Sequence, residues 1–258
     1  MEFQPIILQG FQGREESLKN IKRYIHHITP VMYYRTNDLI HSKRVLWHLE
    51  EAIPKIKKVY ETKFEVNFAR TLALVHDDVE ILTGDVQLHD KEKMNTKELE
   101  TLVKDEKEAI KKIVKMYSQN ANGESYEELL LAAKEKTSLE AQFVSFFDKF
   151  DGAGEAWHEV WAGNNYFSLP AGGNEGTQGG YIRRLNEFSK KYVQMTEFFN
   201  KFPEYLPLPF NFKEVSKKAI PHTKESLEKD SGYLPYERWK RTVIKNEGLD
   251  NLLTQKEF

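Results

Sequence analysis

The sequence contains no cysteine among its 258 residues, which excludes disulfides, thiolate nucleophiles and zinc sites built from cysteine. Any metal ion must therefore be held by His, Asp or Glu side chains and by water. An excess of positive charge is also missing, because 38 Lys and Arg are balanced by 40 Asp and Glu. We therefore expect neither a nucleic-acid partner nor binding to an anionic membrane surface.

Long apolar runs are absent as well. The longest runs, at 129–133 and 72–75, are far shorter than the roughly 20 residues of a membrane-spanning helix. The first residues lack the basic start and apolar stretch of a secretory signal. The sequence thus predicts a cytoplasmic protein, and its 40% hydrophobic residues still permit a sizeable core.

Apolar residues at helical spacing dominate the first half of the chain. They predict a helix over 15–28, a second from Asn37 or Asp38 to near Pro54, and a third over 64–77. Three later helix starts have the capping-box spacing of a short polar residue and an acid three positions later: Asn95 with Glu98, Ser125 with Glu128, and Thr137 with Glu140. Strand-like alternation is hard to find, so we expect an all-α fold.

Glycine is concentrated in one stretch. Residues 152–180 hold eight of the fourteen glycines, which predicts a long loop. Trp157 and Trp161 in this stretch either stack on a nucleotide base or pack the loop itself.

Further helices are predicted over 181–199 and within 235–253. We therefore divide the chain into a helical core, 1–154, and a C-terminal extension of helices and loop, 155–258, packed on that core.

A histidine and an aspartate, His76 and Asp77, stand together where an apolar run gives way to acids. The pair alone is weak evidence, but His41 lies on the preceding predicted helix and Asp148 lies among phenylalanines. Asp is rarely buried unless it is paired or holds a metal. Two imidazoles and two carboxylates suit a divalent ion such as Mn²⁺, Co²⁺, Fe²⁺, Zn²⁺ or Mg²⁺. Adjacent helical residues point about 100° apart, so His76 and Asp77 can share one ion only on the flank between them or where the helix is distorted.

With these residues in this order, the sequence resembles the HD-domain metal-dependent phosphohydrolases, in the branch of bacterial 5′-deoxynucleotidases and their eukaryotic relatives. The resemblance covers roughly 35–152 and is strongest over 73–85 and 135–148. It implies an HD-domain helical bundle, and it carries over the following functional residues: metal ligands His41, His76, Asp77 and Asp148, and Glu80 and Asp85, which act on the attacking water and the substrate.

The phosphate-binding residue is less clear from the resemblance. Relatives often have an acid directly before the first histidine, where this chain has Ile40. Close bacterial members carry an upstream Arg-Trp pair that meets the phosphate, and this chain has His26-His27 in about that place. The candidates for phosphate contact are Arg35, Lys43, His27 and Lys149.

The resemblance implies a homodimer that releases phosphate from 5′-deoxynucleoside monophosphates. Two alternatives stay open. The same site could hydrolyse nucleoside triphosphates, cyclic nucleotides or alarmones. The protein could also be a non-catalytic nucleotide-binding module, although such a module needs no water-activating acid like Glu80.

Overall fold

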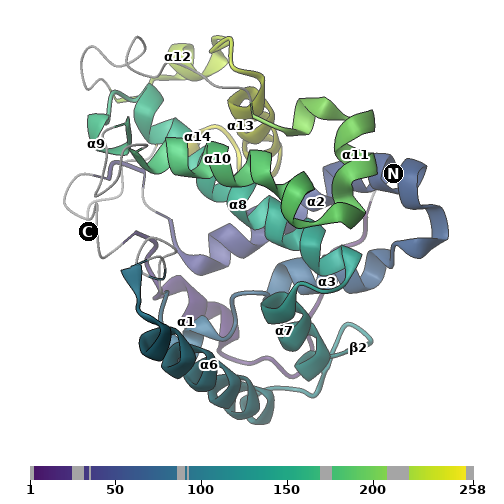
Figure 1. Cartoon of the computed structure of the whole chain (residues 1–258). Helices are drawn as coiled ribbons and strands as arrows, with labels where there is room; N and C mark the ends of the chain where they lie inside the picture. Colours follow the sequence, from purple (N-terminus) through teal and green to yellow (C-terminus); the bar gives the residue numbers. More distant parts are fainter. Residues whose placement is uncertain are drawn as a thin grey trace.

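Helices make up nearly all regular structure in the computed structural model, which describes residues 3–24, 32–34, 36–85, 91, 93–168, 176–207 and 221–253 (Figure 1). The α-helices are α1 (Arg14–Lys19), α2 (Asp38–Tyr60), α3 (Val66–Val75), α4 (Glu80–Thr83), α6 (Thr96–Met116), α7 (Tyr126–Glu135), α8 (Leu139–Trp161), α9 (Asn165–Ser168), α10 (Gly176–Lys191), α11 (Thr196–Lys201), α12 (Lys224–Glu228), α13 (Leu234–Glu247) and α14 (Asp250–Leu253). In these ranges the sole sheet is an antiparallel hairpin of β1 (Asn120–Ala121) and β2 (Glu124–Ser125). The predicted all-α class is confirmed.

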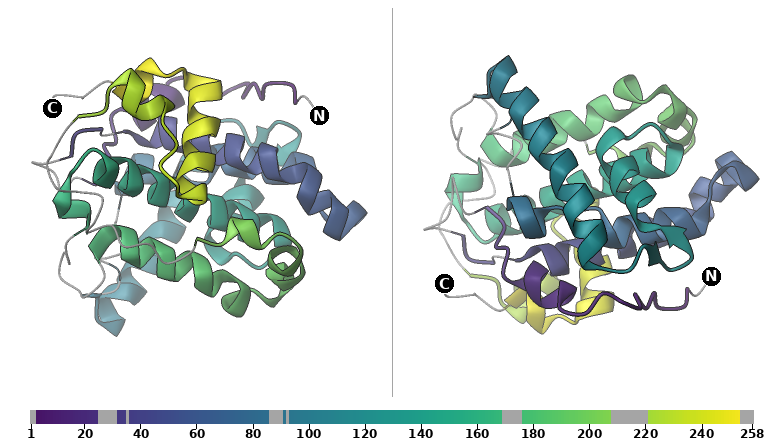
Figure 2. Two further views of the ribbon diagram at one scale, coloured as in Figure 1. Left: turned by 90° about the horizontal axis from the view of Figure 1, so that it is seen from above. Right: turned by 90° about the horizontal axis from the view of Figure 1, so that it is seen from below.

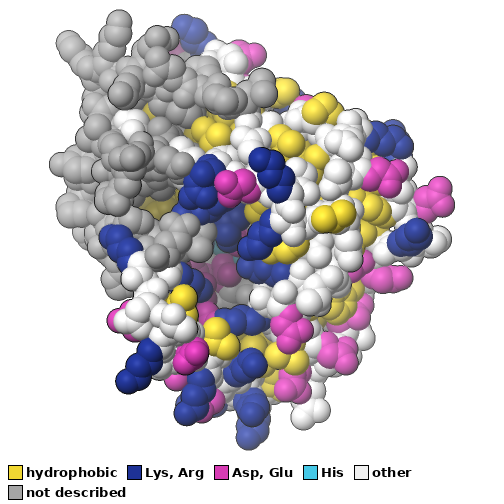
Figure 3. All heavy atoms as spheres, in the orientation of Figure 1, with side chains coloured by type: hydrophobic (Ala, Val, Ile, Leu, Met, Phe, Trp, Pro, Cys, Tyr) yellow, Lys and Arg dark blue, Asp and Glu magenta, His cyan; other side chains and the backbone are white. Residues whose placement is uncertain are grey.

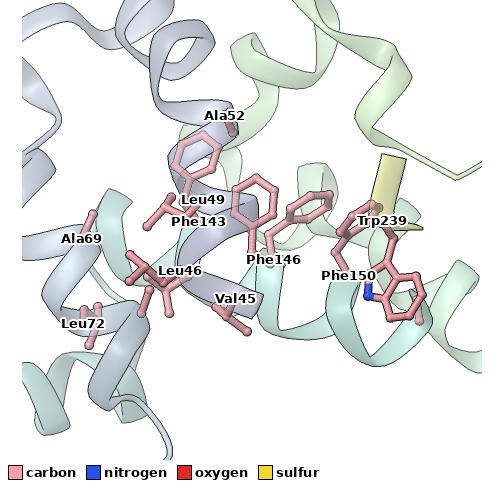
Figure 4. Packing of buried hydrophobic residues seen from close by; sticks show 14 of the residues in the cluster. Val45, Leu46, Leu49, Ala52, Ala69, Leu72, Phe143, Phe146, Phe150 and Trp239 are labelled. Atoms are coloured by element: carbon pink, nitrogen blue, oxygen red, sulfur yellow. The ribbon is translucent and has the colours of Figure 1, made fainter. Parts of the chain in front are cut away.

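Helix α8 lies at the centre and packs against α2, α3, α7, α10 and α13, which surround it in the two further views (Figure 2). Its phenylalanines Phe143, Phe146 and Phe150 are almost fully buried; Phe143 lies beside Leu49 of α2, whereas Phe150 lies beside Trp239 of α13 (Figure 4). Burying a side chain of this size contributes roughly 2 to 3 kcal/mol. The core therefore fixes α2 and α8 against each other, and both helices carry site residues. No helix in the described ranges combines the length and apolar character needed to cross a membrane.

The predicted limits of the first two helices are wrong. Helix α1 ends at Lys19 because the next residues pair with the chain before α2: the amide of Arg23 donates to the carbonyl of Thr36, and the amide of Asp38 to that of Ile21 (both 3.2 Å). Helix α2 continues past Pro54 to Tyr60, although a proline inside a helix removes one hydrogen bond. Its buried face, including the fully buried Ile53 and Ile56, stabilises the helix against that loss.

Helix starts follow the predicted caps in two of three cases. Asn95 and Glu98 form the full capping box, and Ser125 accepts from the amide of Glu128. Helix α8 is instead capped by Ser138, one residue later than predicted, which accepts from the amide of Ala141.

The predicted long loop at 152–180 is also wrong, because α8 runs through its first ten residues and α10 begins at Gly176. Gly152 and Gly154 serve close packing rather than a turn. A Cβ on Gly152 would lie 2.6 Å from the Tyr181 hydroxyl, and one on Gly154 would lie 2.1 Å from the Trp239 indole. Trp157 is likewise a fully buried core residue.

The C-terminal helices differ in detail from those expected. The helix predicted over 181–199 is divided between α10 and α11 by a tight turn at Val193–Met195. The predicted boundary between 154 and 155 falls inside α8, and residues on both sides belong to one hydrophobic cluster. The division into a core and an extension stays a prediction.

Two stacked histidines should make the free energy of unfolding depend on pH. The rings of His158 and His222 lie 4.1 Å apart, and His222 Nε2 donates to the carbonyl of His158. Burial lowers the pKa of His222 to about 4 from 6.5, and burial and His222 lower that of His158 as well. Between pH 6.5 and 4 the unfolded chain therefore binds protons that the folded chain does not, and the free energy of unfolding falls as pH falls.

For His222 this loss amounts to roughly 2 to 3 kcal/mol by pH 4. Urea unfolding from pH 4 to 7.5 measures it, with His222→Gln as the comparison because glutamine keeps a donor at the same place. We expect the variant to lose less stability than the wild type below pH 6.5, and parallel curves would contradict the assignment.

Candidate metal centre and active site

Three helices bring the predicted metal ligands together. His41 lies in the first turn of α2, Asp148 lies in the middle of α8, and His76 and Asp77 directly follow α3. His41 Nε2 is 3.3 Å from Asp148 Oδ1 and 3.6 Å from Asp77 Oδ2, and His76 Nε2 is 3.3 Å from Asp77 Oδ2. Ligand atoms of His41, His76 and Asp148 all lie within 4.8 Å of one another. These four residues are called the His-Asp cluster below.

The chain winds more tightly where the His-Asp pair lies. Helix α3 ends at Val75, after which the amide of Asp78 donates to the carbonyl of Val75 and the amide of Glu80 to that of Asp77, at 3.0 and 2.9 Å. Hydrogen bonds between residues three apart are typical of a 3₁₀ turn. The distortion lets the neighbouring side chains of His76 and Asp77 approach the same point, as sharing one ion requires.

Asp78 anchors this turn and takes no part in the His-Asp cluster. Its carboxylate accepts from Arg14 Nε and from the Tyr126 hydroxyl, both at 2.7 Å. Arg14 also donates to the carbonyl of Leu74. Because Asp78 is completely buried and paired, the two adjacent aspartates have different roles: one faces the cluster and the other holds the backbone.

Both imidazoles present Nε2 to the cluster. His41 Nδ1 hydrogen-bonds Asp151 Oδ2 at 2.7 Å, and His76 Nδ1 hydrogen-bonds the carbonyl of Ala73 at 2.9 Å. Among the described residues neither Nε2 atom has a hydrogen-bond partner, although both are buried. Buried polar atoms rarely lack a partner. The donor set therefore fits a divalent metal ion.

The charges of the cluster also favour a cation. Burial and Arg23 oppose protonation of His41, but the nearby carboxylates of Asp148 and Asp151 outweigh them and raise its pKa to about 10. Burial is likewise outweighed at Asp148, where Lys149 and His41 hold the pKa well below its usual range. The carboxylates thus favour positive charge at His41 Nε2, and a metal ion at this position would replace a proton.

A second group of carboxylates lies beside the cluster. Oxygen atoms of Asp38, Asp77 and Glu80 lie within 4.8 Å of one another, and Asp38 is completely buried. Burial, followed by the charge of Asp77, raises the pKa of Asp38 to about 7 and that of Glu80 well above its usual range. The pKa of Asp85 is raised too, chiefly by burial. Asp38 can therefore take up and release a proton near neutral pH.

The sequence interpretation did not include Asp38 or Arg23 in the site. Asp38 lies three positions before His41, so both are on the same face of α2, and this spacing was the available signal. Arg23 is buried, with Nε 3.1 Å from Glu155 Oε2 and Nη1 3.9 Å from Asp38 Oδ1. Its neighbour is the aromatic Tyr24, so an Arg-aromatic pair does lie upstream of His41.

Lysines lie on the side of Asp148 that faces away from His41. Lys149 contacts Asp148 Oδ2, which leaves Oδ1 facing His41. Burial and the neighbouring charge of Lys149 lower the pKa of Lys136 to about 8. The space-filling view shows a hollow in which Lys and Arg side chains lie around acidic ones (Figure 3). This arrangement suits an anionic substrate that also touches a cation-binding centre.

The remaining predicted phosphate contacts are less informative. Lys43 lies beside Glu15 of α1, with Nζ 3.6 Å from Oε1, and its side chain is 38% exposed. Arg35 and His27 lie outside the described residues, as does His26. Phosphate contacts by Lys43, Arg35 and His27 stay predictions.

Comparisons with known proteins identify a family and proteins of similar fold. The family model of the YfbR-like 5′-deoxynucleotidases matches residues 14–199. None of the curated proteins matches the chain. Among solved structures, a conserved hypothetical protein from Pyrococcus furiosus has a TM-score of 0.53 and 20% identity, covering 80% of this chain and 96% of its own. A predicted metal-dependent phosphohydrolase from Magnetospirillum magnetotacticum MS-1 has a TM-score of 0.48 and 18% identity, covering 76% of this chain and 90% of its own.

The first of these structures supports the fold alone, because its identity to this chain is low. The family match is the stronger finding, since it spans most of the chain and includes every residue of the His-Asp cluster. The chain therefore belongs to the YfbR-like 5′-deoxynucleotidase family, and it is a phosphohydrolase of nucleotides.

Proposed function

We propose that the protein hydrolyses 5′-deoxynucleoside monophosphates to deoxynucleoside and phosphate, with His41, His76, Asp77 and Asp148 as the ligands of one divalent ion. The observation that carries the proposal is the pair of buried, unpartnered Nε2 atoms that face two carboxylates. The finer substrate class is supported by the family whose model the chain matches.

The ion would be held by His41 Nε2, His76 Nε2, Asp77 Oδ2 and Asp148 Oδ1. A divalent ion at such a centre activates water and neutralises negative charge on a phosphoryl group. Mn²⁺, Co²⁺, Fe²⁺, Zn²⁺ and Mg²⁺ are all candidates for two imidazoles and two carboxylates.

Glu80 is proposed to accept the proton of the attacking water. It shares the turn of His76 and Asp77, and its oxygen lies within 4.8 Å of Asp77. Its raised pKa suits a group that must hold a proton after taking it. Asp85, also with a raised pKa, is proposed to hold a sugar hydroxyl or to protonate the leaving oxygen.

Cations on both sides of the centre would position the phosphate. Arg23 lies beside Asp38 and Glu155, and Lys149 lies on Asp148. Guanidinium and ammonium groups bind phosphate oxygens through charge-assisted hydrogen bonds. Lys43, Arg35 and His27 remain candidates from the sequence, and a homodimer in the cytoplasm is part of the same proposal.

A second substrate class is favoured by one observation, the crowding of Lys136 and Lys149 at the edge of the centre. Two such cations could bind more phosphate than a monophosphate carries. Nucleoside triphosphates and alarmones are therefore alternative substrates of the same centre, and cyclic nucleotides stay a further alternative from the sequence. The presence of Glu80 argues against a non-catalytic module, because such a module needs no acid to activate water.

The experiment is to strip the purified protein with a chelator, restore one divalent metal at a time, and measure phosphate release from deoxy- and ribonucleoside mono- and triphosphates. We expect metal-dependent release of inorganic phosphate, fastest from deoxynucleoside monophosphates. Pyrophosphate or tripolyphosphate from triphosphates alone would favour the alternative. No turnover of any nucleotide, with metal bound, would overturn the proposal.

A further inference from the structure

The second ring nitrogen of His41 is tied to the C-terminal part of the chain. Nδ1 hydrogen-bonds Asp151 Oδ2 at 2.7 Å, and the other oxygen of Asp151 accepts from Trp239 Nε1, also at 2.7 Å. Asp151 is completely buried and Trp239 is 1% exposed. The carboxylate of α8 thus links a side chain of α2 to the indole of α13.

The surroundings of Trp239 hold its indole in place. Gly154 leaves space for the indole, because a Cβ at residue 154 would lie 2.1 to 2.3 Å from indole atoms. Arg44 lies 5.4 Å from the centre of the indole, and both oxygens of Glu247 accept hydrogen bonds from Arg44 at 2.6 and 2.8 Å. Helix α13 therefore presents both Trp239 and the partner of Arg44 to α2.

A carboxylate on one imidazole nitrogen decides which nitrogen can bind a metal. A neutral imidazole has one N–H and one lone pair, and Asp151 holds the N–H at Nδ1, so that the lone pair is at Nε2. Asp151 can do so only if its own orientation is fixed, and Trp239 is a donor to its second oxygen. Loss of such a support typically lowers metal affinity 10- to 100-fold.

We infer that Asp151 and Trp239 form a positioning pair that sets the tautomer and direction of His41, and that α13 is therefore part of the metal centre. This inference rests on the proposed metal site. Trp239 lies beyond residue 199, where the family match ends, so the family model does not include this support.

The test compares two Trp→Phe variants that differ in one hydrogen bond. Trp239→Phe removes the indole N–H that Asp151 accepts. Trp157→Phe is the matched control, because Trp157 is also fully buried and its Nε1 has no hydrogen-bond partner in the described ranges. Affinities of the metal-free proteins for Mn²⁺, Co²⁺ and Zn²⁺ are measured by calorimetry, and thermal unfolding without metal measures their stabilities.

We expect Trp239→Phe to weaken binding of the ion that the wild type binds most tightly by about 10- to 100-fold. Trp157→Phe should change it less than about threefold at a similar loss of stability. Equal affinities for the two variants would overturn the positioning role alone. Failure of the wild type to bind any of the three ions would overturn the metal site as well.

If Trp239→Phe does not fold, Asp151→Asn provides the same test. Its side chain has the same shape, but an NH₂ donor replaces one carboxylate oxygen, so it cannot accept from His41 at one atom and from Trp239 at the other. A metal affinity at least tenfold lower supports the positioning pair, and wild-type affinity overturns it.

Discussion

Asp77→Ala will abolish metal binding and phosphate release together. Asp77 Oδ2 lies 3.6 and 3.3 Å from the Nε2 atoms of His41 and His76, so it is the carboxylate shared by both imidazoles. Without it, two neighbouring imidazoles face one remaining carboxylate, and the charge that offsets a dication falls by one unit. Since a catalytic metal stabilises the transition state by several kcal/mol, we expect turnover to fall about 10³-fold or more.

The measurement pairs calorimetric metal titration with phosphate release at saturating substrate. Asp105→Ala, at an exposed position of α6, is the control for removal of an aspartate. It should change neither quantity. Retention of wild-type metal affinity by Asp77→Ala would remove Asp77 from the ligand set, and circular dichroism would confirm that the variant is folded.

Glu80→Gln should separate metal binding from catalysis. Glutamine keeps the shape of the side chain but cannot accept a proton, so water would lose its proposed general base. General bases typically contribute 10²- to 10⁴-fold to a rate, and we expect kcat to fall within that range. Because Glu80 lies beside Asp77, a proposed ligand, and is not itself a proposed ligand, the metal affinity should change only a few-fold.

The two variants, Glu80→Gln and Asp77→Ala, are compared in both metal affinity and rate. A loss of rate with metal retained assigns Glu80 to proton transfer, whereas loss of both quantities would make it a ligand. Wild-type kcat in Glu80→Gln would remove Glu80 from the mechanism. Glu128→Gln, on the first turn of α7, is a matched control for the loss of a glutamate charge.

The sequence predicted best those features that depend on neighbouring residues. The capping box of Asn95 and Glu98 needs only a spacing of three, and it forms as expected. The meeting of His41, His76, Asp77 and Asp148 came from the ordered motif rather than from helix periodicity. Helix periodicity alone argued against a shared ion, because adjacent residues of a regular helix point in different directions. The tight turn after Val75 brings the side chains of His76 and Asp77 to one point.

Features set by distant contacts could not be predicted in this way. Pro54 normally ends a helix, but the buried residues around it stabilise α2. In the sequence Gly154 indicates a loop. In the structure the indole of Trp239 occupies the space that a side chain at residue 154 would need. Arg23 approaches Asp38 through the pairing of residues 21–23 with 36–38, for which the sequence has no local signal.

The continuity of α8 limits how the molecule can open. One helix carries Asp148 at the centre, Asp151 behind His41 and Glu155 beside Arg23, and it extends unbroken from Leu139 to Trp161. A hinge motion between the two halves of the chain would have to bend this helix inside a packed core, which resists deformation. Any opening of the site therefore depends on movement of segments outside α8, while Asp148, Asp151 and Glu155 move as one rigid unit.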